Sequence, residues 1–178
     1  EGIHAKLDDL LSVGETGQEA VARPESRQAR DYALALESLV PQAMEVGSEI
    51  FTVELVQQLH AAVMLSVPSY PDKPGEFRTR VVWIGGTGHI ATSSYNPPAP
   101  ELVPECIDEH IEYLRCEGEQ AQTQGLIVRM AIAHAHFEAV HPFRDGNGRV
   151  GRLLLPLMMA ADGAVPLYLS PYIEAHKQ

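Results

Sequence analysis

Twelve consecutive residues from His141 to Arg152, HPFRDGNGRVGR, combine one histidine, one aspartate, three arginines and three glycines. The segments on both sides carry apolar residues at helical spacing, so HPFRDGNG is predicted to be a tight loop between two helices. Asp145 and Asn147 belong to residue types that cap helices, and we expect them to cap a helix that begins near Gly148. The first amides of that helix would then be free to meet a ligand.

Such a helix start favours anions, because its N–H groups lack partners and its glycines let a ligand approach the backbone. Arg149 and Arg152, three residues apart, would add two fixed positive charges on one face. Asp145 offers a hard oxygen ligand for a Mg²⁺ ion that bridges phosphates. His141 can accept a proton from an attacking hydroxyl group. Together these residues indicate phosphoryl or nucleotidyl transfer.

Each feature also has an ordinary structural explanation. Gly-Asn-Gly turns are common between helices, arginines at helical spacing often form a solvated face, and a single histidine is more often a structural residue than a base. Their concentration in twelve positions of a chain that is short of positive charge favours the functional interpretation.

The rest of the chain predicts a mainly helical fold. Apolar residues recur at helical spacing in six segments, 3–11, 30–40, 52–65, 100–114, 125–140 and 150–161. Thr52 is expected to cap the third of these helices. Pro156 is expected to kink the last helix or to remove one of its backbone hydrogen bonds. Segment 66–76, rich in proline and aspartate, predicts a loop. In RTRVVWIGGTGHIATSS, β-branched residues on both sides of a glycine turn predict one β-hairpin.

Composition sets further limits. A length of 178 residues with 45% apolar residues predicts one domain, and a net charge of −11 argues against nucleic acid as a partner. Cys106 and Cys116 lie ten positions apart without zinc or disulfide spacing, which favours a reducing, cytoplasmic location. We expect no membrane span, because no apolar run is long enough. The chain does not begin with methionine, so Glu1 is expected to be internal to a longer protein.

The twelve-residue stretch resembles the signature of Fic-domain enzymes, His-x-Phe-x-Asp/Glu-Gly-Asn-Gly-Arg-x-x-Arg. Every specified position is filled, by His141, Phe143, Asp145, Gly146, Asn147, Gly148, Arg149 and Arg152. The resemblance extends through AHAHFEAV, PGEFRTRVVWIGG, YNPPAPELV and LYLSPYIEAHK, and so covers nearly the whole chain. It implies the Fic fold, an all-α helical bundle with one β-hairpin flap. We expect a single Fic domain over 1–178, with the flap at 80–92 and the active-site motif at 141–152.

The resemblance implies protein AMPylation, in which a Ser, Thr or Tyr hydroxyl of a target protein attacks the α-phosphate of ATP. His141 would be the catalytic base, Asp145 would hold Mg²⁺, and Phe143 would be the buried anchor. ATP would be bound by Arg144, Asp145, Gly146, Asn147, Gly148, Arg149 and Arg152. His176 stands where the family often has an asparagine near the adenine. The flap residues Val82, Trp83, Ile84 and Gly85 would dock the target by strand addition.

Glu1 and Gly2 resemble the end of an inhibitory motif, Ser/Thr-x-x-x-Glu-Gly/Asn, found in many Fic proteins. Its glutamate pairs with the second arginine of the signature, here Arg152, and keeps that arginine from the γ-phosphate. We therefore expect residues 1–12 to be the remnant of an inhibitory helix region and Glu1 to silence the isolated protein.

Two other functions stay open at this stage. The same site could remove AMP from a target, or the chain could be a catalytically idle module that binds a partner through the flap. A kinase branch of the family is disfavoured by Gly148, which that branch replaces with a bulkier residue. The sequence is compatible with a homodimer. EFR, at 76–78, forms either a surface ion pair or a support for the flap, and we favour the support.

Overall fold

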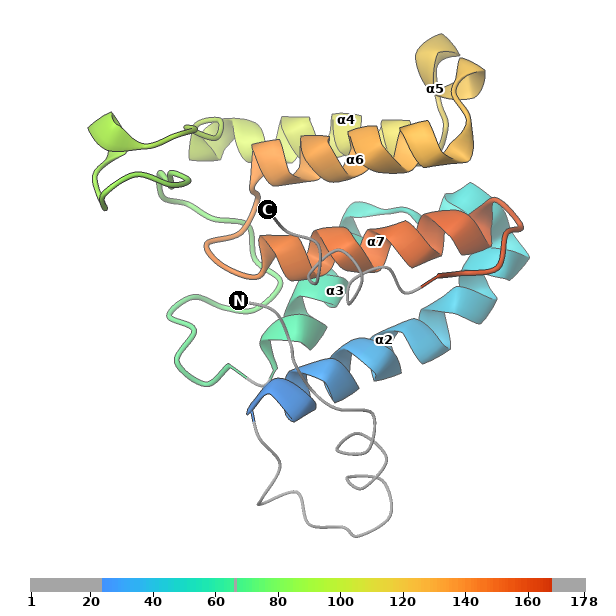
Figure 1. Cartoon of the computed structure of the whole chain (residues 1–178), viewed down its shortest axis with the longest axis horizontal. Helices are drawn as coiled ribbons and strands as arrows, with labels where there is room; N and C mark the ends of the chain where they lie inside the picture. Colours follow the sequence, from blue (N-terminus) through green and yellow to red (C-terminus); the bar gives the residue numbers. More distant parts are fainter. Residues whose placement is uncertain (1–23, 66, 168–178) are drawn as a thin grey trace, which may run out of the picture.

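The computed structural model describes residues 24–65 and 67–167, and in this part of the chain it is a bundle of helices (Figure 1). In chain order the helices are α2 (Pro24–Val46), the 3-10 helix η1 (Gly47–Ile50), α3 (Val53–Met64), the 3-10 helices η2 (Ile90–Thr92) and η3 (Pro100–Leu102), α4 (Val103–Leu114), α5 (Glu119–Thr123), α6 (Leu126–Val140) and α7 (Asn147–Ala161). The prediction of a mainly helical fold is confirmed. The helix expected over 3–11 lies outside the described residues.

Local sequence explains most helix positions. The expected helix over 30–40 falls inside the longer α2, and α3 begins after Thr52, whose side chain accepts a hydrogen bond from the amide of Leu55 as predicted. Pro156 lies inside α7, which nevertheless runs to Ala161. None of the described helices is long and apolar enough to cross a membrane.

Helix α7 is the centre of the bundle. It packs against α6 on one side and against α2 and α3 on the other, while α4 covers α6 (Figure 1). Eleven of its residues are buried, from Asn147 and Val150 through Ala160, as expected of a helix that is covered nearly all round. At Gly151 the approach to α6 is close, because an added Cβ would lie 3.0 Å from Nδ1 of His134.

The packing brings three chain segments to one end of the bundle. Helix α6 ends and α7 begins there, and the segment between α3 and α4 lies at the same end (Figure 1). The turn from α6 into α7 contains the first half of the signature. The fold therefore exposes this loop at the end of a rigid core.

The β-hairpin expected at 80–92 is not confirmed. Among the described residues of this segment, only Ile84 and Tyr95 form an antiparallel bridge, and η2 lies in the loop between them. The expected second strand is replaced by η2, which local hydrogen bonds hold: the Ala91 amide donates to His89 Nδ1, and the Thr92 and Ser93 hydroxyls donate to the carbonyls of His89 and Ile90. Gly86, with φ of 79°, lies against this turn, because a Cβ there would lie 2.2 Å from the carbonyl oxygen of Thr92. We call residues 79–95 the flap segment.

A pair of histidines, of which His110 is buried and His136 is partly exposed, joins α4 to α6. His110 is fully buried against Phe137, and its Nδ1 lies 3.3 Å from Nδ1 of His136. Burial, with a smaller effect of His136, lowers the pKa of His110 to about 3. The neutral imidazole is therefore the form that the folded core accepts.

Protonation of His110 should destabilise the fold as the pH falls. Its folded pKa lies below the unfolded value of 6.5, so the stability that it contributes is complete above pH 6.5 and is lost between pH 6.5 and pH 3. In urea unfolding at a series of pH values, we expect the free energy of unfolding of the wild type to fall as the pH is lowered. For each pH unit it should fall by up to about 1.4 kcal/mol more than that of His110→Phe. His89→Phe, at an exposed histidine, is the control and should keep the wild-type slope. Equal slopes for His110→Phe and the wild type would contradict this assignment.

Candidate active site

The loop between α6 and α7 is closed by the side chain of Asn147. Its Oδ1 accepts a hydrogen bond from the Phe143 amide at 2.9 Å, and its Nδ2 donates to the Phe143 carbonyl at 2.7 Å. Asn147 is 2% exposed and Phe143 is fully buried. The loop thus has a fixed shape, anchored in the core by the Phe143 ring.

The expected capping of α7 is wrong. The N-cap is Gly146, with φ of 82°, and no side chain caps the helix. Asn147 is the first helical residue and uses its amide to close the loop, while Asp145 Oδ1 accepts from the Gly146 amide at 2.6 Å. Glycine is required at 146, because a Cβ there would lie 2.9 Å from Sδ of Met64.

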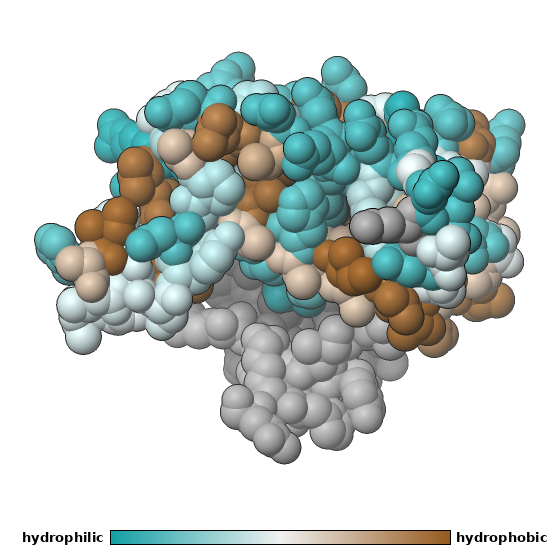
Figure 2. Space-filling model, turned by 90° about the horizontal axis from the view of Figure 1, so that it is seen from above, coloured by the Kyte–Doolittle hydropathy of each residue, from teal (hydrophilic) through white to brown (hydrophobic). Residues whose placement is uncertain are grey.

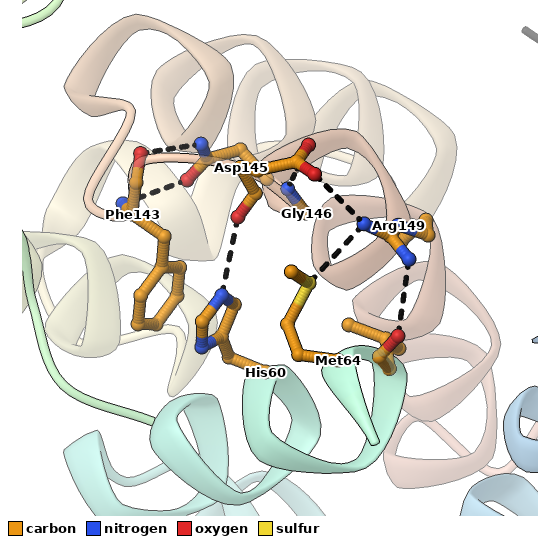
Figure 3. Close-up of polar contacts among 8 residues, drawn as sticks. His60, Met64, Phe143, Asp145, Gly146 and Arg149 are labelled. Atoms are coloured by element: carbon orange, nitrogen blue, oxygen red, sulfur yellow. Dashed lines mark hydrogen bonds and ion pairs between the residues drawn. The ribbon is translucent and has the colours of Figure 1, made fainter. Parts of the chain in front are cut away.

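His60 of α3 holds the loop from below, as Figure 3 shows. Its Nδ1 accepts from the Gly75 amide at 2.8 Å, so its Nε2 carries the proton that is donated to the Asp145 carbonyl at 3.1 Å. Its ring stacks on Phe143 with centroids 3.7 Å apart. Burial lowers the pKa of His60 to about 4, which keeps this neutral tautomer. Sequence reasoning missed His60, because a single histidine in an apolar helix gives no signal.

Arg78 is a buried guanidinium that binds carbonyl groups. It is 5% exposed, and it donates from Nε to His141 O at 2.8 Å and from Nη2 to Val140 O at 3.3 Å, both at the C-terminal end of α6. It also donates to the carbonyls of Arg80 and Pro98, at the two ends of the flap segment. A positive charge at a helix C-terminus is favourable. Arg78 therefore ties the flap segment to the base of the loop.

His141 ends α6 in the left-handed conformation, with φ of 49° and ψ of 59°. Its Nδ1 donates to the Glu138 carbonyl at 3.3 Å, which leaves Nε2 without a proton and able to accept one. Burial is the main cause that lowers the pKa of His141, so the imidazole is neutral near pH 7. These are the properties of a general base.

The start of α7 carries the anion-binding features. The amides of Asn147 and Gly148 donate to no acceptor among the described residues. The guanidinium of Arg149 is fixed on α3, by the Val63 carbonyl at 3.0 Å, and lies 3.3 Å from Asp145 Oδ2 (Figure 3). Arg152 turns the other way, with Nη1 3.1 Å from where a Cβ on Gly148 would stand. The two arginines therefore flank the helix start.

A groove of about 280 Å³ opens beside His141. It is lined by Asp72, Arg78, Thr79, Arg80, Val81, Val82, Trp83, His141 and Arg144. The structure thus brings the expected base together with the expected flap residues Val82 and Trp83, whereas Ile84 and Gly85 do not line the groove. Arg144 lies on this side, 3.7 Å from Asp72, and not among the amides of the α7 start.

Hydrophobic residues gather at the flap end of the molecule, at the left of Figure 2. Val81, Trp83, Ile90 and Tyr95 of the flap segment are 54%, 42%, 39% and 43% exposed. The amides of residues 79–83 make no backbone hydrogen bond among the described residues. This edge is open to pairing with another chain.

The structure does not test two expected site residues. Glu1 and His176 both lie outside the described residues. Within the described part of the chain, no group of three or more His, Cys, Asp or Glu side chains could hold a metal ion. Asp145 alone fits Mg²⁺, because its side chain is 65% exposed and Mg²⁺ on phosphates often takes only one or two protein carboxylates.

Comparison with known proteins identifies the class of this helical bundle and its loop. The model of the Fic/DOC family matches residues 50–159, which is more than half of the chain and includes the whole signature. The chain belongs to the Fic/DOC family.

Individual relatives agree with this placement. Over 118 residues, or 66% of this chain, it is 35% identical to protein adenylyltransferase fic-1 of Caenorhabditis briggsae and 31% identical to protein adenylyltransferase Fic of Drosophila melanogaster. The matched region is 21% and 22% of those proteins, so the chain spans about a fifth of their length.

Solved structures show the same fold. Residues 134–508 of Fic-1 from Caenorhabditis elegans match 98% of this chain with a TM-score of 0.71 and 27% identity, and the match covers 48% of that structure. A signalling protein with a Fic domain from Bacteroides thetaiotaomicron matches 98% of this chain with a TM-score of 0.74 and 19% identity, over 63% of its own structure. The predicted Fic fold is thus confirmed for the helical bundle.

Removal of the buried guanidinium should weaken the fold. We expect Arg78→Met to lower the free energy of unfolding by about 2–4 kcal/mol, because the carbonyls at the end of α6 then stay buried without a donor. Arg80→Met, two residues away on the exposed flap segment, should change it by less than about 0.5 kcal/mol. Chemical denaturation of both variants measures the difference, and equal stability would show that Arg78 does not hold the helix end.

Proposed function

We propose that this chain transfers AMP from ATP to a Ser, Thr or Tyr hydroxyl of a target protein. One observation carries the proposal: a neutral histidine with an available Nε2 stands between the groove of the flap segment and a helix start whose amides are free. The relatives in Caenorhabditis and Drosophila are named protein adenylyltransferases. The site supports the same reaction here.

His141 acts as the base in this mechanism. Its Nε2 takes the proton of the target hydroxyl, the hydroxyl oxygen attacks the α-phosphorus of ATP, and pyrophosphate leaves. The phosphate charge is received at the start of α7 by the free amides of Asn147 and Gly148, next to Gly146, whose own amide donates to Asp145. Arg149 and Arg152 bind the outer phosphates from the two sides of that start.

We propose Asp145 as the residue that holds Mg²⁺ and Phe143 as the anchor of the loop. When bound, the ion neutralises negative charge on the phosphates. The exposed carboxylate beside Arg149 supports this role. Arg144 is proposed at the border of the nucleotide and the target, since it lines the groove with His141. His176 is proposed near the adenine from the sequence alone.

Target docking is proposed at the flap segment, by strand addition along residues 79–83. Their unpaired amides and the exposed Val81 and Trp83 support this mode. Main-chain pairing would place a hydroxyl beside His141 without fixing every side chain of the target. The unpaired Cys106 and Cys116 support the proposed cytoplasmic location.

Labelled ATP tests the proposed reaction. Incubation of a cell lysate and α-labelled ATP with the Glu1→Gly variant, in which the expected inhibition is removed, should label more proteins than the same lysate without the variant. Addition of the variant should not change the labelling from γ-labelled ATP. In this background His141→Ala should reduce transfer at least about a hundredfold, the usual contribution of a general base, and should leave ATP affinity nearly unchanged. A γ-label that depends on the added variant would indicate a kinase. No transfer from either ATP would favour a de-AMPylase or an idle binding module.

Autoinhibition by Glu1 is a further part of the proposal. A carboxylate paired with Arg152 would compete with the γ-phosphate through charge-assisted hydrogen bonds. Glu1→Gly should then raise self-labelling by roughly tenfold, which corresponds to a competing interaction of about 1.4 kcal/mol. Glu1→Asp is the matched control and should stay closer to the wild type. Equal self-labelling of Glu1→Gly and the wild type at saturating ATP would show that Glu1 is not inhibitory.

A further inference from the structure

The groove beside His141 is positively charged, although the whole chain carries −11. Three arginines and one aspartate line it, and His141 is neutral near pH 7. Arg78 at its floor donates only to carbonyl oxygens and pairs with no carboxylate in the described part of the chain. Its charge is therefore not compensated by an acid.

Arg80 is the most available of these charges. Its side chain is exposed, and it forms no ion pair with any described residue. Arg144 is partly neutralised by Asp72 at 3.7 Å. Arg80 also belongs to the unpaired stretch 79–83, where a target strand would lie.

We infer that the flap segment selects target segments with an Asp or Glu side chain close to the modified hydroxyl. This inference rests on the proposed AMP transfer and adds the class of target that the groove accepts. The acid would pair with Arg80 while the hydroxyl reaches His141. Charge complementarity of this kind gives specificity and orientation more than affinity.

The positions of Arg80 and His141 limit how far apart the two groups are. The guanidinium of Arg78 donates to the Arg80 carbonyl at 3.2 Å and to the His141 carbonyl at 2.8 Å, so the backbones of these two residues are neighbours beside the groove. An extended peptide advances about 3.3 Å per residue. The acid is therefore expected within two positions of the modified residue.

The negative charge of the chain does not prevent this selection. At physiological salt the Debye length is about 8 Å, so an acidic target in the groove senses mainly the arginines that line it. The exposed Val81 and Trp83 form the apolar part of the same surface and would cover an aliphatic or aromatic neighbour. The expected occupant is thus a short extended segment with a hydroxyl, an acid and an apolar residue.

The experiment maps the sites that the full chain labels in a cell lysate with ATP, by mass spectrometry of AMP-modified peptides. We expect Asp and Glu within two positions of the modified hydroxyl to be enriched severalfold over the unmodified hydroxyls of the same proteins. A synthetic peptide of the strongest site, with its acid replaced by the matching amide, should react about tenfold more slowly than the acidic peptide. This ratio corresponds to a difference of about 1.4 kcal/mol in free energy.

Reversal of the charge at Arg80 tests whether this residue selects the acidic target. Arg80→Glu should reduce the rate with the acidic peptide by about tenfold or more, with the KM for ATP unchanged, and should react better when the acid is changed to lysine. Lys73→Glu makes the same change of charge at an exposed residue that does not line the groove, and it should behave as the wild type.

The outcomes separate this inference from the proposed function. Labelled sites without acidic enrichment, or an acid-to-amide peptide that reacts at the full rate, would overturn the selection and leave AMP transfer standing. A rise in the KM for ATP in Arg80→Glu, equal to its loss of rate, would assign Arg80 to the nucleotide and also overturn it. No AMP label on any protein with the Glu1→Gly variant, the variant itself included, would overturn the proposed function itself.

Discussion

The arrangement of this site depends on one buried guanidinium among carbonyl oxygens. Arg78 meets the last carbonyls of α6 and also the carbonyls of Arg80 and Pro98, and no described carboxylate neutralises it. A buried charge is costly unless every donor is satisfied. The carbonyl dipoles at a helix C-terminus supply that satisfaction, so the charge is stable only when the end of α6 and the flap segment are both in place. The position of the flap segment and that of His141 are thereby linked.

Two helix ends with opposite dipoles then face the site. The negative end of α6 is held by Arg78 and carries His141, while the positive end of α7 is left open at Asn147 and Gly148. The loop between them is closed by two neutral groups, the Asn147 amide and the His60 imidazole. The Asp145 carboxylate adds a hydrogen bond from the Gly146 amide and an ion pair with Arg149. The proposed base and the proposed anion site thus lie next to each other, at the ends of two packed helices.

The sequence predicts the frame better than it predicts the supports of the loop. Helices α3, α4, α6 and α7 follow from apolar spacing, and the loop follows from its glycines between two such helices. The role of His60 could not be predicted, because its partners Gly75 and Asp145 are distant in sequence. The cap was predicted wrongly because Asn147 is a good capping residue that tertiary contacts use otherwise. The hairpin is not confirmed, because the expected second strand forms η2, which local hydrogen bonds of His89, Thr92 and Ser93 hold, and a single bridge remains.

The most direct measurement is the rate of AMP transfer by Arg78→Lys, under conditions in which circular dichroism shows the variant folded. Lysine keeps the positive charge but is a single ammonium that cannot span carbonyls on two segments as the planar guanidinium does. If Arg78 positions His141, kcat should fall by roughly a hundredfold while the KM for ATP stays near the wild-type value, because misplacement of about 1 Å is enough for such a loss. A folded Arg78→Lys protein with the full kcat would contradict the account.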